Sequence, residues 1–230
     1  MSPEKREISR NPDTPELSRE TIECLTSLCF RSDNSLEPVD LLFLFGTSPS
    51  DTYSDLVRQI LEDNLTKEVV ITGGLPHKKL DDAKVLDLPE SSLILNSLNP
   101  VEFEGVNFTQ ENSSTNTLEN VTEALRIYDF SDVKKLMFVF KSHAAGRGYL
   151  ILKTFLPDVE ILQKTVPGKY EDSNGILIEV SKDDWFKTDI GRARVWGEFL
   201  RMREYGRRGD FDITSVDDSI QKIEQLTNLL

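Results

Sequence analysis

The sequence predicts an α/β fold built on a mainly parallel sheet, with additional helices at both ends of the chain. Three short apolar runs, at 40–45, 68–72 and 135–140, are typical of strands that are buried on both faces. Amphipathic stretches with helical spacing separate these runs, and small or polar residues end each of them. Strand–helix–strand units with short turns build parallel sheets, so this alternation favours a doubly wound core.

The first half of the chain supplies a leader, a helical arm and one strand–helix–strand unit. Residues 1–16 combine three prolines with many charges, which predicts a flexible leader. Apolar positions at helical spacing then predict an N-terminal helical arm over 17–38. The strand at 40–45 is followed by a helix that we expect Ser54 to cap, and the strand at 68–72 ends at Gly73 and Gly74.

The second half continues the alternation and ends in helices. Beyond the strand at 135–140, we expect helices at about 88–98, 118–128, 148–156, 188–204 and 216–230, and strands at 105–109, 159–162 and 176–180. These elements predict a single domain over 17–230. It would consist of the helical arm, an α/β core at 39–182 and a C-terminal helical segment at 183–230.

Composition excludes several classes of function. The 40 acidic against 27 basic side chains give a net charge of −13, which opposes nucleic-acid binding because that binding depends on cationic neutralisation of phosphates. The N-terminus has no apolar signal segment, and the longest apolar run, 41–45, is far too short to cross a membrane. Two cysteines without metal-ligand spacing suit a reducing compartment. We therefore expect a cytoplasmic protein without membrane insertion or a bound metal; the sequence does not indicate its oligomeric state.

Candidate ligand-binding residues follow the buried strands, because ligands of doubly wound sheets bind beyond the carboxyl ends of the strands. They come after each of the three strands and from the polar loop that precedes the helix at 118. The candidates are Gly46, Thr47, Gly73, Gly74, His77, Ser114, Thr115, Asn116, Thr117, Asn120, Lys141 and Arg147.

Each of these candidates also has a purely structural interpretation. Gly73 and Gly74 allow close approach of a ligand, but they also suit an ordinary turn at the end of a strand. Ser114, Thr115 or Asn116 can be the N-cap of the helix at 118, and Glu119 can close a capping box if Asn116 is the cap. Arg147 is placed for a bidentate contact with a carboxylate or phosphate, and it is equally compatible with a surface position.

No motif in the chain specifies a reaction. The sequence lacks the patterns of phosphate-binding loops, dinucleotide-binding loops, serine hydrolases and zinc proteases. If proton transfer occurs, Glu111, Glu119 and His77 are the candidate acid or base groups. Whether the chain is an enzyme is therefore left open.

Taken together, these segments resemble the YdcF/SanA/ElyC superfamily, and most closely its YdcF branch. The resemblance rests on Gly73-Gly74 followed by His77, on the loop Glu111-Asn-Ser-Ser-Thr-Asn116 followed by Glu119-Asn120, and on Gly197-Glu198-Phe-Leu-Arg201 before a Tyr-Gly turn. It runs from about residue 17 to the end of the chain. The family usually opens a helix with Glu-Ala, where this chain has Glu90-Ser91, and the branch often has paired arginines where this chain has Gly146-Arg147.

The resemblance implies a Rossmann-like three-layer α/β/α fold and a small nucleotide-type ligand such as S-adenosylmethionine, without a settled reaction. It also adds Glu198 and Arg201 to the candidate ligand-binding residues. Two alternatives stay open. The departures from the family pattern favour a non-catalytic scaffold or regulatory protein that has lost the site. The envelope-associated SanA and ElyC branches suggest a hydrolase or transferase acting on envelope precursors.

Overall fold

The computed structural model describes residues 8–75, 88–172 and 175–229. The chain divides into two compact units. The sheet unit consists of residues 33–140 and 151–166, and the helical unit consists of residues 1–32, 141–150 and 167–230. The chain passes from one unit to the other several times, and the passage between residues 150 and 151 lies inside a helix.

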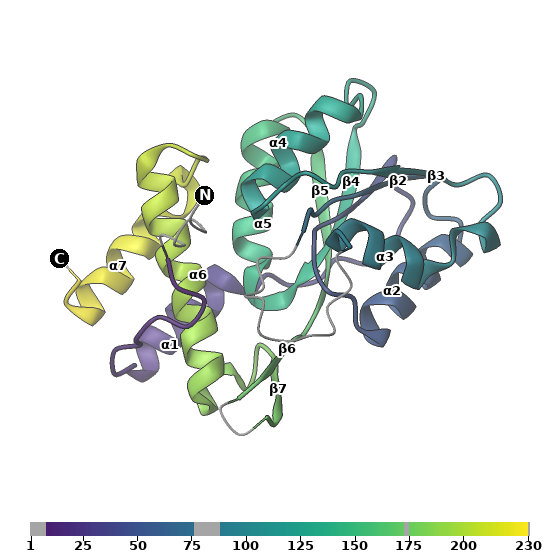
Figure 1. Ribbon diagram of the computed structural model, residues 1–230. Helices are drawn as coiled ribbons and strands as arrows, with labels where there is room; N and C mark the ends of the chain where they lie inside the picture. The colour runs from purple at the N-terminus through teal and green to yellow at the C-terminus, as the bar shows by residue number, and fades with distance from the viewer. Residues whose placement is uncertain (1–7, 76–87, 173–174, 230) are drawn as a thin grey trace, which may run out of the picture. The chain divides into compact units, whose positions relative to one another are not determined.

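The sheet unit is built on a five-stranded sheet with the order β3-β2-β1-β4-β5 (Figure 1). Its strands are β1 (Leu41–Leu44), β2 (Glu68–Ile71), β3 (Asn107–Gln110), β4 (Lys135–Lys141) and β5 (Glu160–Val166). β1 pairs in parallel with both β2 and β4, and β2 pairs in parallel with β3. The first five strands of a Rossmann-type sheet have the same order. The predicted α/β fold with a parallel sheet is therefore confirmed.

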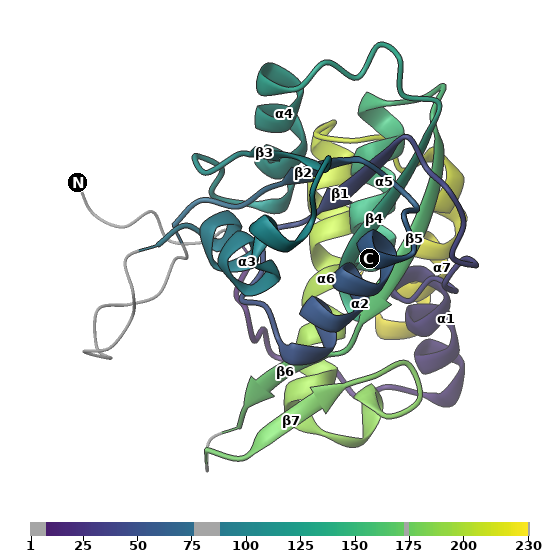
Figure 2. The ribbon, with the colours of Figure 1, turned by 90° about the vertical axis from the view of Figure 1, so that its right-hand side faces the viewer.

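Helices cover both faces of this sheet (Figures 1 and 2). α2 (Asp51–Glu62) and α3 (Glu90–Leu98) lie on one face, and α4 (Thr117–Ile127) with the second half of α5 (Ala145–Phe155) lies on the other. On the first face, alternate strand residues such as Leu42 and Val69 pack against Val57 of α2 and Ile94 of α3. Nearly all residues of β1, β2 and β4 are buried, which explains why these three strands have continuous apolar sequences.

The start of α2 differs from the expectation. Ser50, not Ser54, is its N-cap, and the Ser50 Oγ accepts a hydrogen bond from the backbone N–H of Tyr53 at 3.3 Å. Ser54 lies in the first turn, where its hydroxyl donates to Ser97. Since Asp51 is a favourable residue for the first turn of a helix, the helix begins one turn earlier than predicted.

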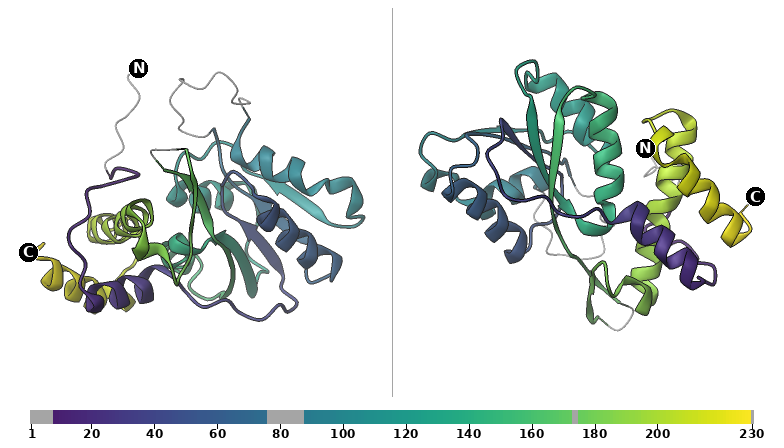
Figure 3. Two further views of the ribbon diagram at one scale, coloured as in Figure 1. Left: turned by 90° about the horizontal axis from the view of Figure 1, so that it is seen from below. Right: turned by 180° about the vertical axis from the view of Figure 1, so that it is seen from behind.

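The helical unit contains α1 (Arg19–Cys29), α6 (Asp189–Arg208) and α7 (Asp217–Thr227), which lie side by side in Figures 1 and 3. It also contains an antiparallel pair of strands, β6 (Gly168–Glu171) and β7 (Leu177–Val180). The strand expected at 176–180 is thus β7, in a separate two-stranded sheet, and β6 was not predicted. No described helix is long and apolar enough to cross a membrane.

The stretch expected to be a leader makes specific contacts with α6. The carbonyl oxygen of Ser9 accepts a hydrogen bond from Arg201 at 2.8 Å. A Cβ atom added to Gly197 would lie 3.4 Å from the Pro12 ring, so the chain around Pro12 runs close along α6.

Candidate functional site

The carboxyl ends of β1 and β2 carry two glycines that lie against each other. A Cβ atom at Gly46 would fall 2.8 Å from the Cα of Gly73, and one at Gly73 would fall 2.7 Å from the Cα of Gly46. Gly73 also has a φ of +120°, which side chains disfavour. The two glycines are therefore required by the close approach of two protein loops, and a role toward a ligand stays a prediction.

Gly74 is held in the same way, by the loop that follows β3. Its N–H donates to the carbonyl oxygen of Ser114 at 2.9 Å, and a Cβ at Gly74 would lie 2.4 Å from that oxygen. The carbonyl oxygens of Gly73 and Gly74 accept hydrogen bonds from the N–H groups of Ser91 and Glu90, respectively. The glycine turn thus caps α3, whose N-cap residue Pro89 provides no side-chain hydrogen bond.

Glu111 organises the loop after β3. Its carboxylate accepts hydrogen bonds from the N–H groups of Gly73, Ser113 and Ser114 and from both serine hydroxyls, at distances of 2.6–3.1 Å. Burial opposes ionisation of this carboxyl, but the hydrogen bonds from Ser114, Gly73 and Ser113 outweigh it and lower the pKa of Glu111. A carboxylate that is so fully engaged is a structural brace and a weak base.

Asn120 joins this loop to β1. Its Oδ1 accepts a hydrogen bond from the N–H of Gly46 at 3.2 Å, and its Nδ2 donates to the Ser114 hydroxyl at 2.6 Å. Thr47, beside Gly46, is buried, and its hydroxyl donates to the carbonyl oxygen of Ser48. The structure therefore brings Gly46, Gly73, Gly74, Ser114 and Asn120 into one network at the carboxyl edge of the sheet.

The start of α4 follows the predicted capping pattern with one change. The Oδ1 of Asn116 accepts from the N–H of Glu119 at 3.0 Å, so Asn116 is the N-cap and Thr117 the first helical residue. Glu119 turns back to the N–H and hydroxyl of Thr115, one residue before the N-cap that a capping box would use. Thr115 and Asn116 remain exposed, and Glu119 is partly exposed.

Two further residues at this edge were not singled out as site residues. Glu90 opens α3, and its Oε2 would lie 2.9 Å from a Cβ at Gly46 and 3.4 Å from one at Gly73. Tyr53 of α2 is buried, and its hydroxyl has no hydrogen-bond partner among the described residues. Burial and then the Glu90 carboxylate raise the pKa of Tyr53. An acidic residue opening a helix was the available signal for Glu90; nothing in the sequence marks the unpaired hydroxyl.

The remaining candidates lie in the helical unit. Arg147 Nε donates to Glu198 at 2.6 Å, and Arg201 Nη1 donates to the other oxygen of Glu198 at 3.1 Å. All three side chains are at most 12 % exposed. Burial alone would raise the pKa of Glu198, but the charges of Arg147 and Arg201 lower it to about 2.

Tyr170 of β6 lies beside this triad and contacts several of its neighbours. Its hydroxyl shares a 2.9 Å hydrogen bond with His143 Nε2, and the Arg194 guanidinium lies 3.9 Å from its ring centroid. Lys141 Nζ lies 5.8 Å from the same centroid. Burial lowers the pKa of His143 to about 3, so this histidine is neutral at physiological pH.

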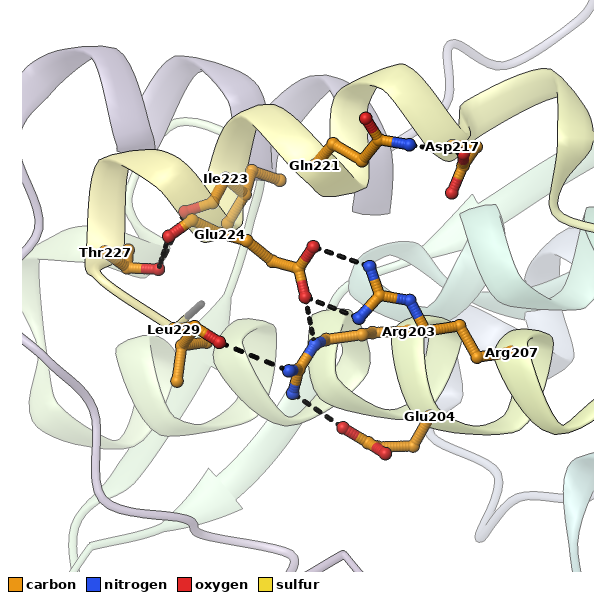
Figure 4. Close-up of polar contacts among 9 residues, drawn as sticks. All are labelled: Arg203, Glu204, Arg207, Asp217, Gln221, Ile223, Glu224, Thr227 and Leu229. Carbon is orange, nitrogen blue, oxygen red and sulfur yellow. Dashed lines mark hydrogen bonds and ion pairs between the residues drawn. The ribbon is translucent and has the colours of Figure 1, made fainter.

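A second buried carboxylate in the helical unit is shown in Figure 4. Glu224 of α7 accepts hydrogen bonds from Arg203 at 2.5 Å and from both Nη atoms of Arg207 at 2.6 Å. Arg203 also donates to Glu204 and to the carbonyl oxygen of Leu229. This arrangement joins α6 to α7 and resembles a structural clamp.

The structure leaves one candidate residue undescribed and bears on the expected metal and cysteine chemistry. His77 lies outside the described residues. Within the described ranges, no group of three or more His, Cys, Asp and Glu side chains is placed to hold a metal ion. Cys24 and Cys29 are both free thiols, the first partly exposed and the second buried.

Comparison with known proteins adds no family assignment. No family model matches the chain, and no curated protein matches it. The geometry of the two groups of residues and the sequence resemblance are therefore the indications of function.

Proposed function

We propose that the chain is a cytoplasmic, YdcF-like protein that binds a small nucleotide-type ligand, such as S-adenosylmethionine, at the carboxyl edge of the five-stranded sheet. Sheets with the order β3-β2-β1-β4-β5 bind their ligands at this edge. The observation that carries the proposal is the Glu90 carboxylate, which lies against Gly46 and Gly73 at the ends of β1 and β2. In Rossmann-type folds, a carboxylate near these strand ends accepts hydrogen bonds from a ribose.

The charge of this edge favours one kind of nucleotide ligand. Glu90 and the ionised Glu111 place negative charge beside the loops, and the whole chain carries a net charge of −13. A polyphosphate would be repelled, whereas an adenosine group with a cationic sulfonium or amine would be attracted. The exposed amide of Asn116 and the buried hydroxyl of Tyr53 supply further hydrogen-bonding groups.

Binding is the activity that these groups support. Glu111 is engaged by five donors, and Glu119 is engaged by Thr115, so both carboxylates already serve the local backbone. The lowered pKa of Glu111 makes its carboxylate a poor proton acceptor at neutral pH. We assign no reaction to this edge.

Isothermal titration calorimetry tests the proposal with S-adenosylmethionine, S-adenosylhomocysteine, adenosine and ATP. We expect the first two to bind and ATP to bind more weakly. Replacing Glu90 by Gln should weaken binding by roughly ten- to a hundredfold, since a hydrogen bond to a charged group contributes about 1.5–3 kcal/mol. Glu62→Gln is the matched control. Glu62 is exposed at the C-terminal end of α2, away from the carboxyl ends of the strands, so this substitution should leave the affinity unchanged.

A non-catalytic scaffold or regulatory protein is the second candidate function. It is favoured by the way Glu111, Ser114 and Asn120 satisfy one another, which holds the loops together without any ligand. If none of the adenosine compounds binds at millimolar concentration, the ligand proposal is wrong and the scaffold function is supported.

A further inference from the structure

The helical unit contains a concentration of positive charge that is unusual for so acidic a chain. We define the α6 basic cluster as Arg10, Arg147, Arg194 and Arg201, which surround Tyr170 and Glu198. Arg194 stacks on the Tyr170 ring at 3.9 Å, and Lys141 Nζ lies 5.8 Å from it. Arg10 and Arg201 act electrostatically on both Tyr170 and Arg194.

Glu198 neutralises only part of this charge. Both of its oxygens are taken by Arg147 and Arg201. Among the charges that act most strongly on Tyr170 and Arg194, Glu198 is the one carboxylate, while Arg10 and Arg201 are both cationic. The cluster therefore keeps a surplus of positive charge.

Arg194 shows the consequence of this surplus most directly. Its Nε is buried and has no hydrogen-bond partner among the described residues. Burial, together with the charges of Arg10 and Arg201, lowers the pKa of Arg194. Because buried polar atoms are normally hydrogen-bonded, an unsatisfied guanidinium N–H indicates that an acceptor from outside the chain, such as an anion, completes the site.

His143 adds a second unsatisfied atom around the same tyrosine. Its Nε2 is bonded to the Tyr170 hydroxyl, but its buried Nδ1 has no partner among the described residues. The histidine is 3 % exposed. Unsatisfied polar atoms thus flank Tyr170 in two residues that come from separate segments of the chain.

We propose that the α6 basic cluster binds the phosphate group of a small molecule, with Arg194 as its principal ligand. A phosphate dianion matches a surplus of several positive charges better than a single carboxylate does, and guanidinium groups bind its oxygens in a bidentate manner. The net charge of −13 disfavours a nucleic-acid backbone as the source of that phosphate. This site belongs to the helical unit and does not depend on the ligand proposed for the sheet edge.

Calorimetric titration at constant ionic strength tests the site with inorganic phosphate, glycerol phosphate and succinate. We expect both phosphates to bind and succinate to bind at least tenfold more weakly. The tighter of the two phosphates distinguishes a free ion from a phosphate ester. Arg194→Met should weaken phosphate binding at least tenfold, whereas Arg192→Met, which removes a charge that is ion-paired with Asp189 on the same helix, should change it less than twofold.

Thermal unfolding separates ligand binding from a structural role of Arg194. Without phosphate, Arg194→Met should unfold at the same temperature as the wild type or higher, because it removes a buried N–H that has no acceptor among the described residues; the rise in Tm that phosphate gives the wild type should disappear. Three results would overturn the proposal: no phosphate binding by the wild type at millimolar concentration, succinate binding as tightly as phosphate, or an Arg194→Met protein that is less stable yet binds phosphate normally. Asn116 variants, which alter the sheet edge, should bind phosphate normally.

Discussion

Glu224 and Glu198 are both buried carboxylates held by two arginines, yet their surroundings differ. Glu224 has Arg203 and Arg207 as partners, and these arginines are 18 % and 43 % exposed (Figure 4). Glu198 has Arg147 and Arg201, which are 10 % and 12 % exposed, and further cations lie beyond them. A balanced ion cluster that reaches water indicates a structural clamp, whereas a buried cluster with surplus charge indicates a place for an anion.

The largest difference between the two clusters should appear when each carboxylate is neutralised. Glu198→Gln leaves two buried arginines unpaired beside other cations, so it should lower the free energy of unfolding by about 3–5 kcal/mol. Glu224→Gln leaves arginines that can reach water, and Arg203 keeps Glu204, so the loss should be about 1–2 kcal/mol. Urea unfolding monitored by circular dichroism measures both. Equal losses would show that the surplus charge around Glu198 has no energetic effect.

The ionisation of Glu198 should also affect how the stability of the protein depends on pH. The pKa of Glu198 is lowered from 4.5 to about 2 in the folded chain. Its contribution is therefore fully present above the unfolded pKa and is lost as the pH falls from about 4.5 towards 2. Unfolding free energies between these pH values should fall less steeply for Glu198→Gln than for the wild type. Parallel curves would mean that Glu198 has an ordinary pKa in the folded protein.

Glu111 extends the comparison to a carboxylate held by neutral donors alone. Glu111→Gln would turn an NH₂ group toward the N–H groups of Ser113 and Ser114, leaving at least one donor without an acceptor. We expect a loss of about 1–3 kcal/mol in unfolding free energy. The exposed Glu104→Gln in the same unit is the control, with an expected change below about 0.5 kcal/mol. A similar change in both variants would mean that Glu111 does not brace the loop.

The parts of this molecule that the sequence predicts are those fixed by local pattern. The apolar runs of β1, β2 and β4 predict the parallel sheet, and the polar loop before α4 predicts three candidate caps, of which Asn116 is the one observed. β6 was missed because Gly168–Glu171 has neither an apolar run nor regular alternation.

The contacts around the candidate site were beyond the reach of the sequence. Gly73 indicates close approach of some group, but its position along the chain does not reveal that the group is Gly46. Likewise, the stacking of Arg194 on Tyr170 joins segments that only the tertiary fold brings together. A sequence pattern can therefore identify a residue that another group must approach closely, but only the tertiary fold shows which group that is.

The smallest expected effect comes from Asn116, whose side-chain oxygen and nitrogen can be tested separately for helix capping and ligand binding. The Asn116 Oδ1 caps α4, while its amide nitrogen makes only a long 3.4 Å contact with the Thr115 hydroxyl. Asn116→Ala should therefore lower the free energy of unfolding by about 1 kcal/mol, whereas Asn116→Asp keeps the capping oxygen and should preserve stability. If the amide nitrogen donates to the adenosine ligand, both variants should weaken its binding in calorimetry. An Asn116→Asp protein with wild-type affinity would limit Asn116 to its role as a cap, and the ligand would then depend on Glu90 and its neighbours.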